Sequence, residues 1–468
     1  MRGAQEATVY PGAGPPADPR NLLAWIERAA AAGRGAEVLA QLTAVAERAD
    51  LSLALRQQAA QLLTHLNRHV EAERCSARCA RDAPDDAQIL YNWAAALTAV
   101  GRLEDAERTY DRVIALAPQD ADAWYNRSTL RRQTPARNHV AALEARLATM
   151  APGDAGRVAL EYALARELED LGQYPQAFAA LQRGADARRQ RLSYRVAADT
   201  AAMAAIARTF DAAWSANLRP GLADERPVFI VGLPRSGTTL VDRIVSSHSA
   251  VASRGESTDL AAAVTRCAAG ARGKTELIRQ AALADPAHLG AEYCRTLPET
   301  AARRVIDKTP LNFLYLGLIR AALPSATLIH VRRAPLDVCY AMYKTLFRMA
   351  YPFSYSLEDL AQYYIAYDAL MQHWRSTLKG ALLEVDYEEL VASQEDVSRR
   401  LIAHCGLEWQ PQVLEFERNT APTLTASAAQ VRQPIYRSSV GLWRRYAAQL
   451  LPLRARLAAA GIETHECD

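Results

Sequence analysis

The chain has no long hydrophobic run. Among its 468 residues, no stretch approaches the ~18 uninterrupted apolar residues that a membrane-spanning helix needs, so we expect no membrane span. The first segment (1–20), MRGAQEATVYPGAGPPADPR, lacks the hydrophobic core of a secretory signal and is expected to form a flexible lead-in. The seven cysteines are odd in number and scattered, which fits a reducing, cytoplasmic location better than a disulfide scaffold.

A strong net charge is missing as well. Lys and Arg number 55 and Asp and Glu 52, and the net charge of +3 is too mild to predict a nucleic-acid partner. The small basic excess is enough for a local anion site. Half of the residues are hydrophobic and 23% are charged, as in an ordinary soluble globular protein, and the length allows two or three domains.

Residues 21–220 contain almost no β-branched runs and are rich in Ala, Leu, Arg and Glu at helical spacing. Related segments recur at a constant interval: RADLSLA at 48, DAPDDAQ at 82, LAPQDAD at 116 and MAPGDAG at 150. The interval of 34 residues is the length of the helix–turn–helix unit in tetratricopeptide repeats. We therefore predict an all-α solenoid over 21–220. The concave face of a solenoid is a candidate surface for a peptide or protein acceptor, or for a homodimer contact.

The pattern changes after Arg226, where short apolar runs alternate with helical ones. PVFIVG, ATLIHVR and GALLEVDY are typical of buried strands, and each is followed by a helical segment. This alternation predicts an α/β domain with a mainly parallel sheet over 226–468. In such sheets ligands bind beyond the carboxyl ends of the strands, where the first glycine-bearing loop lies.

The stretch GLPRSGTT (232–239) has the two-glycine spacing of a phosphate loop, whose backbone N–H groups and following helix N-terminus point at one anion. The lysine that reaches the γ-phosphate in triphosphatases is missing, because Thr238 stands there, while Arg235 offers a guanidinium earlier in the loop. No acidic strand end suited to Mg²⁺ stands out, although Asp307 and Asp386 remain alternatives. The loop therefore favours a nucleotide that is clamped without a metal.

Four sequence blocks resemble those of the sulfotransferases that use 3′-phosphoadenosine 5′-phosphosulfate. The blocks are PRSGTTL (234–240), VIDKTPLNFLYLGLI (305–319), VRRAPLDVCYAMYK (331–344) and AQVRQPIYRSSVGLWRRY (429–446). The layout is similar to that of bacterial proteins that fuse tetratricopeptide repeats to a sulfotransferase domain, a group akin to tyrosylprotein sulfotransferases. The resemblance implies a phosphate-loop-like sulfotransferase fold, the nucleotide as co-substrate, adenosine 3′,5′-bisphosphate as product, and no metal.

The resemblance also implies which residues bind the nucleotide. The 5′-phosphosulfate would be held by Arg235, Ser236, Gly237, Thr238 and Thr239. Arg333 matches the arginine that grips the 3′-phosphate, with Arg332 as the alternative if the register slips by one. Where the family has a serine for the same phosphate, this sequence has Ala341, and Tyr340 and Lys344 are the candidates to compensate.

Catalytic roles follow from the same resemblance. Lys308 matches a lysine used on the transferring sulfuryl group, and Glu256 matches the proposed general base. Ser427, Gln430 and Arg437 lie in the last block, where a serine and a basic residue contact the phosphosulfate. Physically, charge builds on the bridging and equatorial oxygens during sulfuryl transfer. Positioned cations such as Arg235 and Lys308 would stabilise that charge, and a carboxylate would take the acceptor's proton.

Several of these residues have structural interpretations that stay open. Glu256 would cap a helix starting near Ser257, Lys308 would pair with Asp307, and Ser427 would make a local turn. We expect His248 to end the helix of the loop rather than to act as a base. Four residues have ligand types that suit zinc but are expected to be packing: His65, His69, Cys75 and Cys79.

The sequence leaves the acceptor open. A tyrosine hydroxyl on a peptide or protein is one candidate, and a small molecule or carbohydrate is another. A non-catalytic nucleotide-binding scaffold is the alternative from a different class, supported by Ala341. A nucleotide kinase or triphosphatase is disfavoured by the missing lysine.

Overall fold

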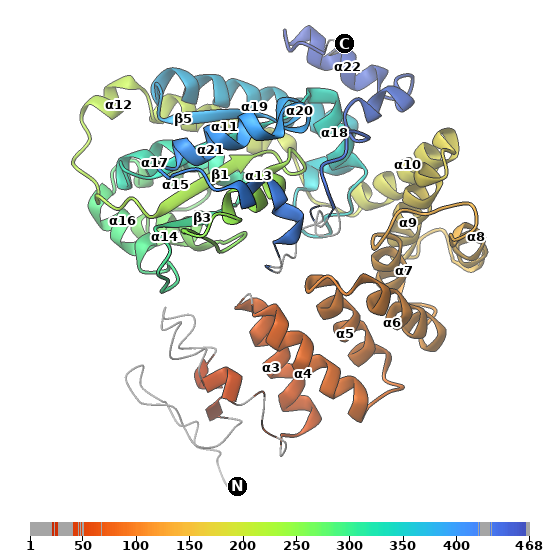
Figure 1. Cartoon of the computed structure of the whole chain (residues 1–468). Coiled ribbons are helices and arrows are strands. Elements are labelled where there is room, and N and C mark those ends of the chain that lie inside the picture. The colour runs from red at the N-terminus through yellow and green to blue at the C-terminus, as the bar shows by residue number, and fades with distance from the viewer. Residues whose placement is uncertain are drawn as a thin grey trace, which may run out of the picture. The chain divides into compact units, whose positions relative to one another are not determined.

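The protein is described by a computed structural model, which covers residues 21–22, 24–26, 41–44, 46, 48, 51–66, 68–419, 421, 431 and 433–464 (Figure 1). The chain divides into two compact units, Met1–Ala117 and Pro118–Asp468. The division falls inside the region predicted as one solenoid (21–220), so the later predicted repeats belong to the same unit as the sheet. We describe each unit separately.

The first unit consists of helical hairpins. Its main described helices are α3 (Leu53–His65), α4 (His69–Asp82), α5 (Ala87–Ala99) and α6 (Leu103–Leu116). The interval between the starts of α3 and α5 (53 and 87) equals that between the starts of α4 and α6 (69 and 103). Ser52 and Asp86 accept backbone N–H groups at the starts of α3 and α5, which satisfies donors that the helix leaves unpaired. The predicted repeat period is thus present in the helix positions.

The second unit begins with further helices. These are α7 (Ala121–Ser128), α8 (Val140–Thr149), α9 (Arg157–Asp170), α10 (Tyr174–Gln190), α11 (Val196–Thr209) and α12 (Ala212–Ala216). The helix α7 starts at the same interval after α5 (87 to 121), whereas α9 starts later than that interval predicts (121 to 157). The constant interval between helix starts therefore ends with α7.

The sheet and the elements around it follow. The strands are β1 (Pro227–Gly232), β2 (Val251–Ser253), β3 (Arg304–Asp307), β4 (Thr327–Arg332) and β5 (Leu382–Asp386). The helices between them are α13 (Thr238–Ser246), α14 (Asp259–Cys267), α15 (Lys274–Ala281), α16 (Pro286–Cys294), η1 (Pro310–Tyr315), α17 (Leu316–Ala322), α18 (Pro335–Tyr343), η2 (Pro352–Tyr355) and α19 (Leu357–Thr377). After β5 come α20 (Tyr387–Ala392), α21 (Gln394–His404), η3 (Pro411–Arg418), η5 (Leu442–Tyr446) and α22 (Leu451–Ala459).

The five strands are parallel, in the order β2-β3-β1-β4-β5. The first strand lies at the centre and is buried along its whole length, which explains its continuous apolar sequence. Val228 and Ile230 pack in a core with α13, α20 and α21. Phe229, which points to the opposite face, packs against Tyr293 of α16. Helices therefore cover both faces of the sheet.

The predicted strands PVFIVG, ATLIHVR and GALLEVDY are confirmed as β1, β4 and β5, and the parallel sheet is confirmed. The strands β2 and β3 were not predicted. They are three and four residues long, too short for an apolar run to stand out.

The helices at the start of the second unit pack against elements beside the sheet. The Tyr162 hydroxyl of α9 donates to the Tyr343 carbonyl at the end of α18 (3.2 Å), and Arg189 of α10 pairs with Asp359 of α19 (2.6 Å). Arg348, in the loop after α18, pairs with Asp122 of α7 (2.7 Å). These contacts attach α7, α9 and α10 to the elements that follow β4 in the chain.

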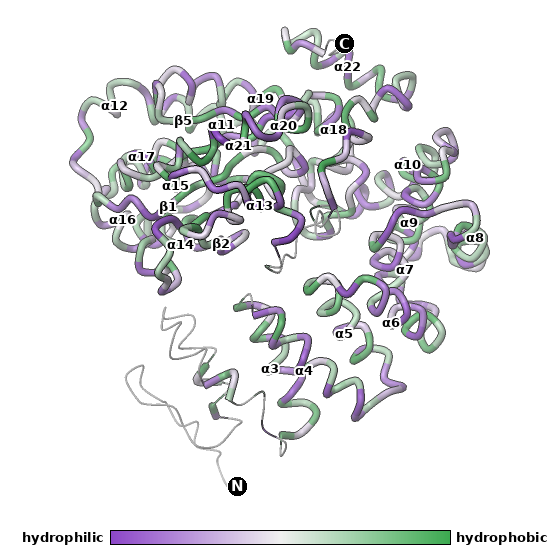
Figure 2. The backbone as a smooth tube through the Cα atoms, viewed as in Figure 1, coloured by the Kyte–Doolittle hydropathy of each residue, from purple (hydrophilic) through white to green (hydrophobic). Residues whose placement is uncertain are grey.

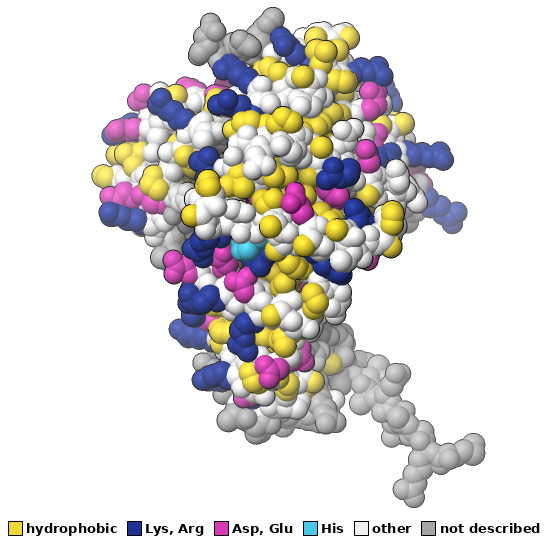
Figure 3. Space-filling model, turned by 90° about the vertical axis from the view of Figure 1, so that its right-hand side faces the viewer, with side chains coloured by type: hydrophobic (Ala, Val, Ile, Leu, Met, Phe, Trp, Pro, Cys, Tyr) yellow, Lys and Arg dark blue, Asp and Glu magenta, His cyan; other side chains and the backbone are white. Residues whose placement is uncertain are grey.

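Hydropathy follows this burial. Hydrophobic residues are concentrated in the strands and in the helices packed on them, and hydrophilic residues are more frequent on the outer helices (Figure 2). On the face drawn in Figure 3, basic and acidic side chains lie interspersed, as their near-equal numbers lead one to expect. No helix in the described part of the chain combines the length and apolarity needed to cross a bilayer.

A buried polar group joins β4, β5 and α19. His330, in the middle of β4, bonds through Nδ1 to Glu384 Oε1 of β5 (2.8 Å) and through Nε2 to the Tyr367 hydroxyl of α19 (2.6 Å). Arg375 donates to both carboxylate oxygens of Glu384 (2.9 and 3.0 Å). Burial lowers the pKa of His330. Although burial opposes ionisation of Glu384, the bonds from His330 and Arg375 lower its pKa to about 2.

This group predicts a loss of stability in acid. The pKa of Glu384 falls from 4.5 to about 2 in the folded state. Its contribution to stability is therefore complete above pH 4.5 and is lost as the pH falls through 2. We expect Glu384→Gln to be less stable near neutrality and to show a smaller loss of unfolding free energy across this window, measured by urea denaturation. Equal losses for wild type and Glu384→Gln would contradict this role. The control is Glu395→Gln, which removes an exposed carboxylate of α21.

Candidate active site

The loop between β1 and α13 needs glycine at two positions. Gly232 has a φ of 155°, and a Cβ there would lie 2.5 Å from the Val331 carbonyl oxygen of β4. Gly237 has a φ of 108°, and a Cβ there would lie 2.5 Å from Cδ2 of Tyr387, the first residue after β5. Both are conformations that side chains rarely adopt, so these contacts fix the loop against the ends of β4 and β5.

Arg235, between the two glycines, adopts a left-handed conformation with a φ of 67°. This conformation is uncommon for residues other than glycine and concentrates at functional sites. The loop leads directly into α13, whose first N–H groups have no partner within the helix and point toward the N-terminal end. The backbone is therefore arranged to face an anion.

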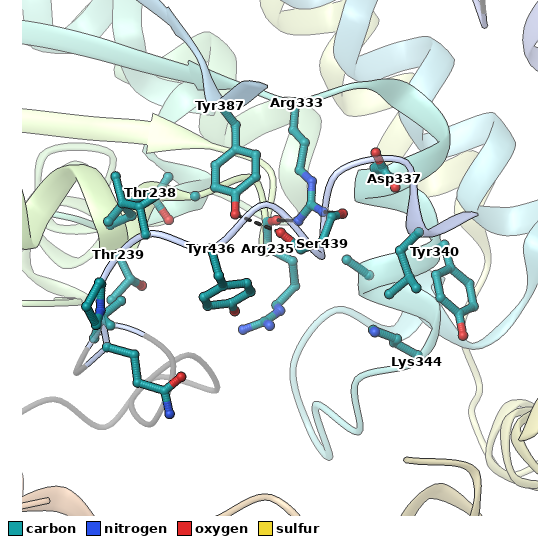
Figure 4. Close-up of a pocket in the computed structure, with 18 of the residues that line it drawn as sticks. Arg235, Thr238, Thr239, Arg333, Asp337, Tyr340, Lys344, Tyr387, Tyr436 and Ser439 are labelled. Carbon is teal, nitrogen blue, oxygen red and sulfur yellow. Dashed lines mark hydrogen bonds between the residues drawn. The ribbon is translucent and has the colours of Figure 1, made fainter. Parts of the chain in front are cut away.

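A pocket opens beside this loop (Figure 4). It is lined by Gly237, Thr238 and Thr239 at the start of α13, by Arg235, by Arg333 after β4, and by Tyr340, Ala341 and Lys344 along α18. The structure thus brings together the predicted phosphosulfate loop and the predicted 3′-phosphate arginine. Ser236 does not line the pocket: its buried Oγ has no hydrogen-bond partner in the described structure and lies close to Gly232.

Arg333 is held at the pocket by carbonyl groups and an aromatic ring. Its Nη1 donates to the Arg235 carbonyl (3.1 Å) and its Nη2 to the Ser439 carbonyl (2.6 Å). The guanidinium lies 4.7 Å from the centroid of the Tyr387 ring. Its Nε is buried without a partner among the described residues. Arg332 faces away and pairs instead with Glu384 (3.6 Å) and Asp386 (3.4 Å).

Two arginines at one pocket give it positive charge. Burial lowers the pKa of Arg235; the Tyr436 phenol opposes this, whereas the neighbouring Arg333 adds to it. A buried cation beside a like charge is costly unless an anion is near. The pocket is therefore suited to a ligand with several negative charges.

The C-terminal segment 433–442 forms one side of the pocket. Asp337 of α18 accepts the backbone N–H groups of Gly441 (2.7 Å) and Trp443 (3.3 Å). The Tyr387 hydroxyl lies 2.9 Å from Ser439 Oγ. These bonds hold the segment so that Tyr436 lies beside Arg235 in the pocket (Figure 4).

The polar groups of α18 are engaged by a carboxylate from α9. Lys344 Nζ donates to Glu169 Oε1 (2.6 Å), and the Tyr446 hydroxyl donates to Oε2 (2.9 Å). The Tyr340 hydroxyl also donates to Glu169. Burial opposes ionisation of Glu169, but the Lys344 ammonium and these hydrogen bonds hold its pKa below the ordinary value. Tyr340 and Lys344 therefore line the pocket beside Ala341 with their polar atoms already bonded.

A second charged group lies at the ends of β2 and β3. Lys308, which follows β3, is buried with 1% of its side chain exposed, and its Nζ lies 2.6 Å from Glu256 Oε1. Glu256, in the loop after β2, is 46% exposed, so solvent or a substrate reaches it. Burial raises the pKa of Asp242 of α13, and Lys308 opposes this, which places the ammonium near the helix of the loop. Glu256 pairs with Lys308, whereas Asp307 does not.

Other predicted residues lie elsewhere. Ser427 and Gln430 are outside the described residues, and Arg437 is exposed and does not line the pocket. His248 accepts the Ala250 N–H at Nδ1 (3.1 Å) and donates through Nε2 to the Glu408 carbonyl (2.8 Å). Both ring nitrogens are therefore bonded to backbone groups.

The remaining alternatives also have structural partners. Asp307 is bonded to Tyr293 (3.0 Å), Thr309 (2.7 Å) and Asn312 (3.3 Å), and burial raises its pKa. Asp386 pairs with Arg332 at the end of the sheet. In the first unit, Cys75 donates to the Arg56 carbonyl (3.3 Å) and His65 bonds the Gln61 carbonyl (2.8 Å).

Sequence reasoning missed the pocket residues Asp337, Tyr387, Tyr436 and Ser439, and it missed Glu169. The first two had a signal, because they follow β4 and β5 at the edge where the loop lies. Glu169 had none, since it lies 175 residues before Lys344 in a helix assigned to another domain.

The bonds of Glu169 predict a cost for its neutralisation. Glu169→Gln keeps the shape of the side chain but leaves the Lys344 ammonium without its counterion. Because Lys344 lines an open pocket, we expect a loss of about 2 kcal/mol in unfolding free energy, below the value for a fully buried pair. Chemical denaturation measures the loss, with Glu144→Gln, an exposed carboxylate of α8, as the control. An unchanged stability would show that the pair contributes little.

Comparison with known proteins finds similarity over the residues that form the sheet. Residues 227–411 match the family model described as the sulfotransferase family. An uncharacterized protein of Aquifex aeolicus (strain VF5) is 34% identical over 252 residues, which make up 50% of this chain and 32% of that protein. The chain thus spans about a third of the length of the curated relative it matches.

Solved structures with similarity to this chain include the sulfotransferase domain from the curacin biosynthetic pathway (17% identity, TM-score 0.36, covering 53% of this chain and 100% of that one). The sulfotransferase domain from the Synechococcus PCC 7002 olefin synthase has 18% identity and a TM-score of 0.36, over 52% of this chain and 98% of that one. A sulfotransferase from Alicyclobacillus acidocaldarius has 17% identity and a TM-score of 0.30, over 52% and 97%. The similarity of this chain to the sulfotransferase family thus extends over residues 227–411.

Proposed function

We propose that the α/β domain transfers a sulfuryl group from 3′-phosphoadenosine 5′-phosphosulfate to an acceptor hydroxyl. The observation that carries this proposal is the convergence of Arg235 and Arg333 on one pocket at the β1–α13 loop. The Lys308–Glu256 pair at the ends of β2 and β3 supplies groups for the transfer itself. The family match of residues 227–411 supports the reaction class.

The residues of the pocket fit such a nucleotide. Arg235 and the N-terminus of α13 would hold the 5′-phosphosulfate, and Arg333, with a buried Nε that has no partner in the described structure, would hold the 3′-phosphate. The glycines at 232 and 237 allow the backbone to approach the ligand closely. When bound, the donor supplies an activated sulfuryl group whose departure leaves adenosine 3′,5′-bisphosphate.

The chain's own groups would perform the remaining work. Glu256 is exposed enough to meet an acceptor and would take the proton of its hydroxyl. Lys308 would stabilise the negative charge that develops on the transferring group, and its burial strengthens that interaction. A tyrosine of a peptide or protein is the first acceptor to test, beside small molecules and carbohydrates.

The donor site predicts selective nucleotide binding. Calorimetry should show that adenosine 3′,5′-bisphosphate binds without metal and more tightly than ATP with Mg²⁺. Arg333→Ala should weaken the bisphosphate by about 10- to 100-fold, because a charge-assisted hydrogen bond contributes about 1.5–3 kcal/mol.

Arg332→Ala is the matched control, since its guanidinium pairs with Glu384 and Asp386 rather than lining the pocket. A preference for ATP with Mg²⁺ would overturn the proposed donor. Equal losses in the two variants would remove the role of Arg333.

The catalytic pair predicts a loss of turnover without a loss of donor binding. With labelled donor and a panel of peptides, phenols, carbohydrates and cell extract as acceptors, Lys308→Ala should lower kcat about 10²–10³-fold while the bisphosphate Kd stays unchanged. Lys379→Ala, at an exposed lysine, should leave kcat unchanged.

Glu256→Gln should lower kcat as well, and the double variant should cost little more than either single one, because the two groups act together. Full turnover in Lys308→Ala would exclude its catalytic role. Donor binding without transfer to any acceptor in wild type would favour a nucleotide-binding scaffold.

A further inference from the structure

The first unit carries a groove that the proposed reaction does not use. It is formed by α4, α5 and α6, and its lining includes five arginines: Arg74, Arg78 and Arg81 of α4, Arg102 before α6, and Arg112 within α6. Trp93 of α5 and the small residues Ala77 and Ala80 form its apolar part.

The arginines of α4 lie on one face of the helix, because their spacings of four and three residues match the helical repeat. Arg74 and Arg81 are exposed, and within the described part of the chain neither lies within salt-bridge distance of a carboxylate. Arg102 and Arg112 reach the groove from the neighbouring hairpin. Arg112 donates to the Pro84 carbonyl (2.6 Å), which directs its guanidinium toward the C-terminal end of α4.

The carboxylate that lines the groove already accepts hydrogen bonds from neighbouring side chains. Glu73 is the one carboxylate among its described lining residues, and 11% of its side chain is exposed. Its Oε1 accepts Trp93 Nε1 (3.1 Å) and Arg102 Nη1 (3.0 Å). Arg102 pairs with this carboxylate, and Arg78 donates to the Ala46 carbonyl (3.3 Å). Among the described residues, the surplus of positive charge therefore lies mainly at Arg74 and Arg81.

The acidic residues near the rim are paired too. Asp82 bonds Arg56, and Asp105 bonds both Arg102 (2.7 Å) and Arg108. Asp85 lies 3.9 Å from Arg112, and 86% of its side chain is exposed. Asp105 and Asp85 therefore offset part of the charge of Arg102 and Arg112, and Arg74 and Arg81 of α4 are left for an outside anion.

We propose that this groove binds an acidic peptide segment. Seven residues of α4 separate Arg74 from Arg81, a rise of about 10 Å. An extended peptide rises about 3.3 Å per residue, so carboxylates on alternate residues lie about 6.6 Å apart, and the long side chains of Arg74 and Arg81 span the remaining difference. The guanidinium fork matches a carboxylate bidentately, and Trp93 with Ala77 and Ala80 gives apolar surface for the side-chain stems. The proposal does not depend on the reaction of the α/β domain.

The test uses the full chain and a fluorescein-labelled peptide of alternating Glu and Ala, with binding followed by fluorescence anisotropy. The peptide should bind, and raising the salt concentration should weaken it. The Arg74→Gln/Arg81→Gln variant should lose about tenfold in affinity, the equivalent of two modest ion pairs. The matched control, Arg108→Gln/Arg418→Gln, also removes two exposed arginines but none from the groove, and should change affinity less than twofold.

Other outcomes would overturn the proposal. No binding of the Glu–Ala peptide, equal binding of a Gln–Ala peptide, or equal losses in both variants would each exclude this site. Tighter binding of a labelled oligothymidylate with the same dependence on Arg74 and Arg81 would assign the groove to nucleic acid instead. Circular dichroism of the variants confirms that the helices are intact. Loss of peptide binding with normal sulfuryl transfer separates this inference from the proposed function.

Discussion

The lack of side chains at Gly232 and Gly237 is the constraint on which the pocket depends. A Cβ at either position would lie 2.5 Å from an atom of a neighbouring strand end, the Val331 carbonyl in one case and the Tyr387 ring in the other. The loop can therefore lie directly against the ends of β4 and β5. Since Arg333 and Tyr387 follow those two strands, this close approach brings three separate stretches of sequence to one place. The direction of Arg235 and of the first N–H groups of α13 follows from it.

Bringing Arg235 and Arg333 together has an electrostatic cost that the chain offsets only in part. Arg333 receives partial negative charge from the carbonyls of Arg235 and Ser439 and from the Tyr387 ring. Burial and the neighbouring cation nevertheless lower the pKa of Arg235, which means that its charged form is less stable in the pocket than in water. An entering anion reverses this imbalance. Anion binding and the stability of the loop are therefore linked, because a ligand that binds only the native state stabilises it.

The sequence predicted the parts of the site that are local in the chain. The glycine spacing and Arg235 indicate an anion loop from one short continuous stretch, and the apolar runs of β1, β4 and β5 predict the parallel sheet around it. The pairing of Lys308 with Glu256, rather than with Asp307, was not predictable, because it depends on β2 and β3 being neighbours. Tyr436 is positioned through Asp337 and Tyr387, which lie far before it in the chain, and no local pattern reports such contacts. The contacts of α7, α9 and α10 with α18, α19 and the loop between them were not predictable for a similar reason, because a repeat pattern reports only neighbours along the chain.

The helix α9 alters the charge of the pocket wall formed by α18. Ala341 offers no polar atom, and the nearest polar side chains on α18, Tyr340 and Lys344, are both bonded to Glu169. With three donors and a pKa held below its ordinary value, Glu169 keeps its charge, so an anion near Lys344 must compete with a carboxylate that is already in place. The positive charge of Lys344 is therefore largely cancelled within the chain. It follows that the arginines after β1 and β4, rather than the helix α18, supply most of the attraction for an anion. The helix α9 sets this balance from outside the residues that match the sulfotransferase family model.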